Sequence, residues 1–90
     1  MSTLTILGWA FSTKFENSNQ KLIAIAMGEC PGQQGLIIET GYDFLAEFCL
    51  MSRADVEREV GNMVKSGFLA PAPKPSWETE DSAYFYPIGA

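Results

Sequence analysis

The chain has 90 residues, a formal net charge of −5 and a hydrophobic fraction of 47%. This length fits a single domain covering residues 1–90, and this composition excludes a wholly disordered chain. No apolar run approaches the roughly 18 residues that span a bilayer, and the N-terminus lacks the basic and apolar blocks of a signal peptide. We therefore expect a cytoplasmic protein with no membrane partner.

The inventory of reactive side chains argues against catalysis. Histidine is absent, and the two cysteines, Cys30 and Cys49, do not have the spacing of metal ligands. Acidic residues occur in pairs four positions apart, but any solvated helix face has that spacing. We expect no enzyme activity, no metal and no other cofactor. Cys49 is expected in the core, since a buried free cysteine behaves as a small hydrophobic residue.

The N-terminal part of the chain predicts an extended arm, a helix and a strand. Residues Thr3–Phe15 are apolar but alternate poorly, so we expect an arm or short strand that packs on the core. A helix is predicted over Asn19–Met27, because Asn17-Ser-Asn19 offers capping side chains and Gly28 offers a stop. The apolar run Leu36–Ile38 predicts the first strand.

Two further helices are predicted next. The first covers residues 41–49, and the second begins after Ser52, whose spacing to Asp55 is typical of a helix start. An apolar stripe at helical period runs along the second helix, and Gly67 predicts its end. The residues expected to form the core of the helical part are Leu22, Ile25, Leu45, Phe48, Val56, Val60 and Met63.

Two strands are expected to flank a polar tip near the C-terminus. The first covers residues 68–70 and precedes three prolines at alternate positions, which hold a chain extended. The second covers Ala83–Ile88, with Phe85 toward the core. Between them, Trp77–Asp81 is predicted as a turn, in which Trp77 either folds back or anchors a partner.

Several short motifs follow one another along the chain, from about Gly8 to Pro87. They are Trp9-Ala10, Lys21-Leu-Ile-Ala-Ile-Ala26, Gly35, Leu45-Ala46, Cys49-x-Met-Ser-Arg53, Val56 and Lys65-Ser-Gly-Phe-Leu69. Their order resembles the winged helix-turn-helix domains of phage and plasmid replication and regulatory proteins. The resemblance implies an α+β fold that is mainly α with a small β-sheet: three helices plus a two- to three-stranded wing. At the turn, where that family often has glycine, this chain has Leu50.

The resemblance implies a small, non-enzymatic protein of phage or mobile-element type that binds double-stranded DNA. Such a regulator or replication accessory acts in a bacterial or phage-infected cell, often as a homodimer, with the helix after Ser52 in the major groove. Arginine pairs with guanine or phosphate, and lysine and serine contact phosphate. The candidate DNA contacts are Ser52, Arg53, Arg58, Lys65 and Lys74.

Charge favours an alternative function. In the predicted last helix and wing, acidic residues outnumber basic ones, and DNA is a polyanion. The alternative is an acidic winged-helix inhibitor or adaptor that binds a basic protein or nucleoprotein, such as an anti-CRISPR or other counter-defence protein. Its candidate contacts are Glu57, Glu59, Trp77, Glu78, Glu80 and Asp81, with Glu57 and Glu59 expected on the outer part of the helix. The arginines also have a structural interpretation: Arg53 pairs with Glu57, and Arg58 pairs with Asp55.

Overall fold

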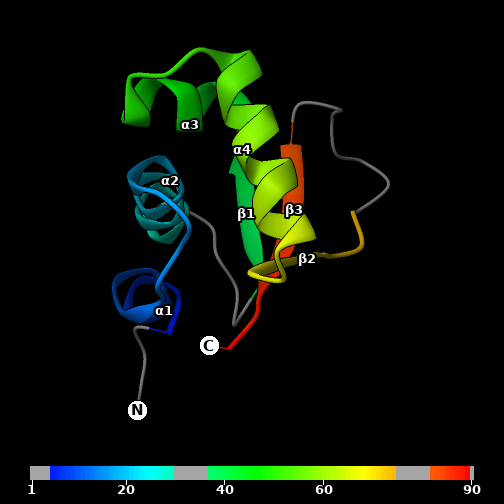
Figure 1. The fold of residues 1–90 in the computed structure, drawn as a ribbon. Helices are drawn as coiled ribbons and strands as arrows, with labels where there is room; N and C mark the ends of the chain where they lie inside the picture. Colours follow the sequence, from blue (N-terminus) through cyan, green and yellow to red (C-terminus); the bar gives the residue numbers. More distant parts are fainter. Residues whose placement is uncertain (1–4, 30–36, 75–81, 90) are drawn as a thin grey trace.

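The fold combines helices with a small antiparallel sheet, as the sequence predicted (Figure 1). The computed structural model describes residues 5–29, 37–74 and 82–89. In chain order the elements are α1 (Thr5–Ser12), α2 (Ser18–Gly28), β1 (Ile38–Gly41), α3 (Tyr42–Cys49), α4 (Arg53–Lys65), β2 (Leu69–Pro71) and β3 (Ser82–Pro87). The described part of the chain therefore has four helices, one more than expected.

Strand β3 lies in the middle of the sheet, and both of its neighbours are antiparallel to it. Ile38 of β1 lies opposite Phe85, and Leu69 of β2 lies opposite Pro87. Phe85 is buried, as predicted from its position between two tyrosines. Strand β1 begins later than expected, at Ile38, and Leu36 lies outside the described residues.

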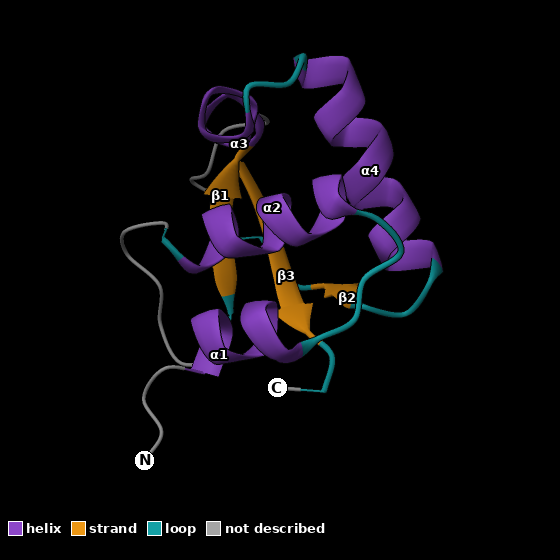
Figure 2. Cartoon of the chain, turned by 60° about the vertical axis from the view of Figure 1, so that its left-hand side comes forward, coloured by secondary structure: helices purple, strands orange, loops and turns teal. Residues whose placement is uncertain are grey.

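Helix α2 is the central helix of the structure. It contacts α1, α3, α4 and β1, and Figure 2 shows it between α1 and α3. Ile23, Ala24, Ala26 and Met27 are fully buried, which fits a helix that is apolar on most of its sides. Its N-cap is Asn17, whose side-chain oxygen accepts the N–H of Gln20.

The expectation of an extended arm over Thr3–Phe15 is wrong, because residues Thr5–Ser12 form α1. Ile6, Trp9 and Ala10 are buried, and their spacing of three and one is that of a helix face. Tertiary contacts hold this short helix in place. The Trp9 indole N–H donates to the Ile88 carbonyl at 2.9 Å. The Lys21 ammonium donates to three carbonyl groups at the C-terminal end of the helix, those of Ala10, Phe11 and Thr13.

Helix α2 ends at Gly28, but without the left-handed glycine cap that was predicted. The residue after it, Glu29, has φ −94°, so the helix does not end in a left-handed glycine cap. A Cβ atom on Gly28 would lie 2.7 Å from the Leu7 side chain. Glycine at this position therefore lets α1 approach α2 closely, and a larger residue would make the Leu7 side chain shift.

The predicted core is partly confirmed. Leu45, Val56, Val60 and Met63 are buried, but Phe48 is 42% exposed. Leu22 is 38% exposed, and Ile25 is partly buried and packs against the core. On α3 the core face passes through Leu45 and Cys49, and one residue along a helix is a rotation of about 100°. Phe48 therefore lies at the edge of the core face, where it is partly exposed.

None of the helices in the described ranges combines the length and the apolar character that crossing a bilayer requires.

Candidate interaction site on helices α3 and α4

The turn between α3 and α4 has a left-handed backbone conformation at Leu50, the position where the resembled family often has glycine. Leu50 has φ 56° and ψ 44°, which is the left-handed region. Its N–H donates to the Glu47 carbonyl, and the Met51 N–H donates to the Ala46 carbonyl at 3.0 Å. The Leu50 side chain is 92% exposed. Burial therefore does not compensate for the steric cost of this conformation, which is about 1 kcal/mol for a residue with a Cβ atom.

Replacing Leu50 by glycine is expected to leave the free energy of unfolding unchanged or to raise it by up to about 1 kcal/mol. Glycine adopts positive φ without strain, and little packing is lost with so exposed a side chain. Urea denaturation of the two proteins measures the difference. A loss above about 2 kcal/mol would show that Leu50 stabilises the fold through packing.

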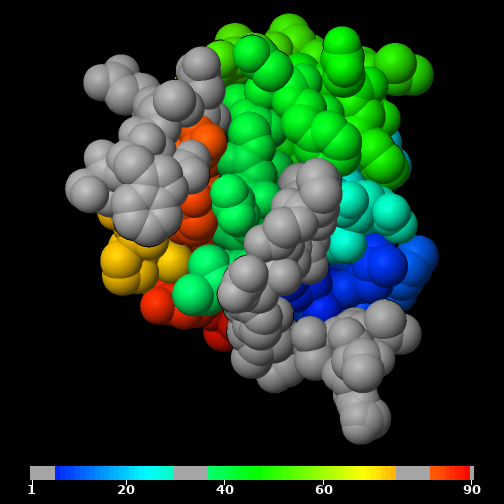
Figure 3. Space-filling view, turned by 180° about the vertical axis from the view of Figure 1, so that it is seen from behind, coloured from blue at the N-terminus to red at the C-terminus, as the bar shows by residue number. Residues whose placement is uncertain are grey.

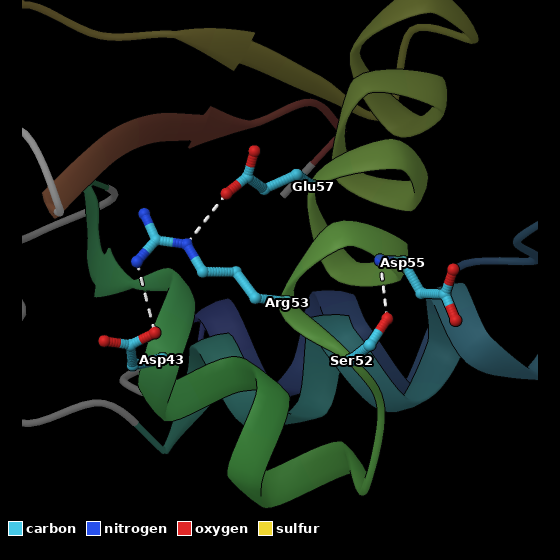
Figure 4. Close-up of polar contacts among 5 residues, drawn as sticks. All are labelled: Asp43, Ser52, Arg53, Asp55 and Glu57. Carbon is cyan, nitrogen blue, oxygen red and sulfur yellow. Dashed lines mark hydrogen bonds and ion pairs between the residues drawn. The ribbon is translucent and has the colours of Figure 1, made fainter.

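Helix α4 begins at a side-chain cap. The Ser52 hydroxyl oxygen accepts the N–H of Asp55 at 3.1 Å, as predicted (Figure 4). The Asp55 carboxylate in turn accepts a hydrogen bond from Arg58 at 2.7 Å. The hydrogen bond from Arg58, followed by the one from Ser52, holds the pKa of Asp55 below its usual range. The start of the helix is therefore stabilised by a carboxylate near its N-terminus.

Arg53 connects α3 to α4. Its guanidinium lies between the Asp43 carboxylate of α3, at 3.2 Å, and the Glu57 carboxylate of α4, at 2.8 Å (Figure 4). It also lies over the Tyr42 ring, 5.6 Å from the ring centroid. The pKa of Tyr42 is raised, first by burial and then by Glu57, while Arg53 partly opposes this shift. The ion pairs predicted for the two arginines of α4 are thus both present.

The candidate DNA contacts are spread along α4. Arg53 is in the first turn and Lys65 in the last, so twelve residues, or about 18 Å of helix, separate them. Lys65 is exposed and forms no ion pair within the described ranges. Lys74 is also exposed and lies beyond β2. The basic side chains therefore form no compact cluster.

The expectation that Glu59 lies on the outer part of α4 is wrong. Glu59 is buried, and its carboxylate accepts hydrogen bonds from Gln20 at 3.2 Å and from Asn17 at 3.5 Å. Gln20, which is fully buried, also bonds to Glu16 through both its amide nitrogen and its oxygen. Glu59 therefore joins α4 to the start of α2 and is removed from the candidate contacts. Glu57 is exposed, as expected.

Four candidate residues of the predicted wing lie outside the described residues: Trp77, Glu78, Glu80 and Asp81. Cys30 also lies outside them. Cys49 is buried, as predicted, and burial raises the pKa of its thiol.

An exposed apolar and acidic surface on α3 was missed by sequence reasoning. Phe44 and Phe48 are exposed one helical turn apart, with ring centroids separated by 5.8 Å. Asp43 and Glu47 form a parallel row, displaced by one residue. With Leu50, these residues are named the α3 corner. The helix forms the top of the molecule in Figure 1 and is open to solvent in the space-filling view of Figure 3.

Within the ranges that the structure describes, histidine, cysteine and acidic side chains form no group of three or more that could hold a metal ion. Comparison with protein families, with curated proteins and with solved structures finds no match to this chain.

Proposed function

We propose that this protein is a non-enzymatic interaction module of the winged-helix type that binds a basic protein or nucleoprotein through α3 and α4. The order α2, β1, α3, α4, β2, β3, with β3 between the other two strands, supports the winged-helix assignment. Helix α1 then precedes the first helix of the motif. Because this fold supports several functions, the function is argued from the surface of α3 and α4.

The observation that carries the proposal is the placement of Arg53 between Asp43 and Glu57. Two carboxylates surround one guanidinium, so the strongest candidate for contact with DNA is already neutralised. Arg58 is paired with Asp55 in the same way. The side chains of α3 and α4 that reach solvent then have a negative balance, with four acidic residues (Asp43, Glu47, Asp55, Glu57) against three basic ones (Arg53, Arg58, Lys65). A negative surface attracts a basic partner and repels a phosphate backbone.

Binding of double-stranded DNA is the second candidate function. The observation that favours it is the exposure of Arg58 and Lys65 on α4, the helix that follows the turn, and of Ser52 at its N-cap. In winged helix-turn-helix proteins this helix enters the major groove. The ion pairs of the arginines are solvent-exposed, and exposed pairs contribute only about 0–1 kcal/mol. A phosphate would therefore compete directly with the carboxylates for both guanidinium groups.

Charge variants distinguish the two functions. We expect the wild-type chain not to bind a fluorescent random-sequence duplex at low salt, as measured by anisotropy. The variant Asp43→Asn with Glu57→Gln frees Arg53 and is expected to gain weak binding, because two repelling charges are removed. The matched variant Arg53→Ala with Arg58→Ala is expected to bind no better than wild type. Tight wild-type binding that the arginine variant abolishes would reverse the order of the two functions.

A further inference from the structure

We propose that Leu50 is the anchor of the α3 corner, and that it inserts into an apolar pocket bordered by lysine and arginine on the partner. This inference rests on the proposed function, and it names the contact residue and the chemistry of the surface that it fits. Leu50 occupies the short connection between α3 and α4, so the backbone projects its side chain away from both helices into solvent.

The conformation of Leu50 is the first argument. A leucine at φ 56° with 92% of its side chain exposed stabilises neither the turn nor the core. Glycine would relieve the backbone strain at this position. Backbone strain of this kind is concentrated at functional sites, including those that hold ligands. Apolar side chains that fill a pocket at the centre of an interface contribute most of its affinity.

The surroundings of Leu50 are the second argument, and they define the partner. Phe44 and Phe48 on α3 are partly exposed and extend the apolar surface toward the turn. Asp43, 79% exposed, and Glu47 run beside them. Asp43 shares Arg53 with Glu57, so these three carboxylates and one guanidinium keep a net negative charge. An apolar centre with a charged rim is the usual construction of a protein interface. Because this rim is acidic, a second copy of the same surface would repel it, whereas a basic rim would attract it.

A random peptide library displayed on phage, selected against the immobilised chain, supplies the probe. We expect the enriched peptides to combine several lysines or arginines with aliphatic or aromatic residues. The enriched peptide is then synthesised, and its affinity is measured for wild type and for the single variants Leu50→Gly and Phe48→Ser. Each variant is expected to weaken binding at least about tenfold. Phe11→Ser is the matched control, because Phe11 is 65% exposed but lies on α1, and it is expected to change the affinity less than about twofold.

Thermal denaturation separates a lost contact from a lost fold. Leu50→Gly is expected to keep or raise the melting temperature, by up to roughly 5 °C, while it loses affinity. If Leu50→Gly binds the enriched peptide as tightly as the wild type does, Leu50 is not the anchor. The proposed function would still stand if Asp43→Asn with Glu57→Gln weakened binding of the same peptide. If the selection enriches acidic peptides, or enriches no peptide, both the role of Leu50 as anchor and the basic character of the partner are contradicted.

Discussion

Replacing Leu45 by alanine is expected to lower the free energy of unfolding by about 2–5 kcal/mol. Leu45 is fully buried where α3 packs on the rest of the core, so the change removes buried methyl groups and leaves a cavity. A chain of this size has a total stability of roughly 5–15 kcal/mol, so the variant loses a large share of it. Urea denaturation followed by circular dichroism measures the loss.

The neighbouring phenylalanine on the same helix is the control for this prediction. Phe48 is larger than Leu45 but 42% exposed, so Phe48→Ala is expected to cost less, roughly 1 kcal/mol. The comparison tests which face of α3 packs inward. If Phe48→Ala is as costly as Leu45→Ala, or costlier, α3 is rotated relative to the structure described here.

Replacing Gln20 by leucine is expected to cost about 2–3 kcal/mol, although leucine is apolar and similar in volume. Gln20 donates to Glu59 and to Glu16 and accepts the Glu16 N–H, so the change leaves a buried carboxylate with Asn17 as its one remaining partner among the described contacts. A buried polar group without its partner costs about 1–3 kcal/mol, and more when it is charged. Thermal or urea denaturation at neutral pH measures the loss.

The matched control replaces both partners. When Glu59→Leu is added to Gln20→Leu, no buried carboxylate is left unpaired, so part of the lost stability should return. If the double variant is less stable than Gln20→Leu alone by the full cost of a second substitution, the two residues do not act as a pair.

Glu16, which is bonded to Gln20, makes the free energy of unfolding depend on pH. The hydrogen bonds from Ser66 and then from Gln20 lower the pKa of Glu16 in the folded chain. A carboxyl group whose pKa is lowered by folding stabilises the folded chain at every pH above its pKa in the unfolded chain. That stabilisation is lost as the pH falls through its pKa in the folded chain.

Local signals predicted the helices that begin at caps. Asn17 and Ser52 each accept a backbone N–H from the first turn of the helix that follows, as their positions in the sequence indicated. Gly67 has φ 88°, as expected for the residue after a helix. For α1, the residues before Thr5 lie outside the described ranges, and the Trp9 and Lys21 hydrogen bonds that hold this helix come from other parts of the chain. A single sequence does not show these contacts.

The candidate site was predicted less completely than the fold. The ion pairs of Arg53 with Glu57 and of Arg58 with Asp55 follow from helical spacing, and both are present. The pair between Arg53 and Asp43 joins two helices, so it depends on their packing. The burial of Glu59 also depends on packing, because its partner Gln20 is 39 residues away. Phe48 was placed in the core because hydrophobicity alone does not show which side of a short helix faces inward.

The most direct test of the central claim is titration of a labelled random-sequence duplex with the wild-type chain across a series of salt concentrations. Binding to phosphates is tightest at low salt, so a protein that reads DNA through α4 would show its affinity there. With its arginines held by carboxylates, the chain is predicted to give no saturable binding even at the lowest salt. Saturable binding with a log–log salt slope of about −0.9 per phosphate contacted would contradict the account.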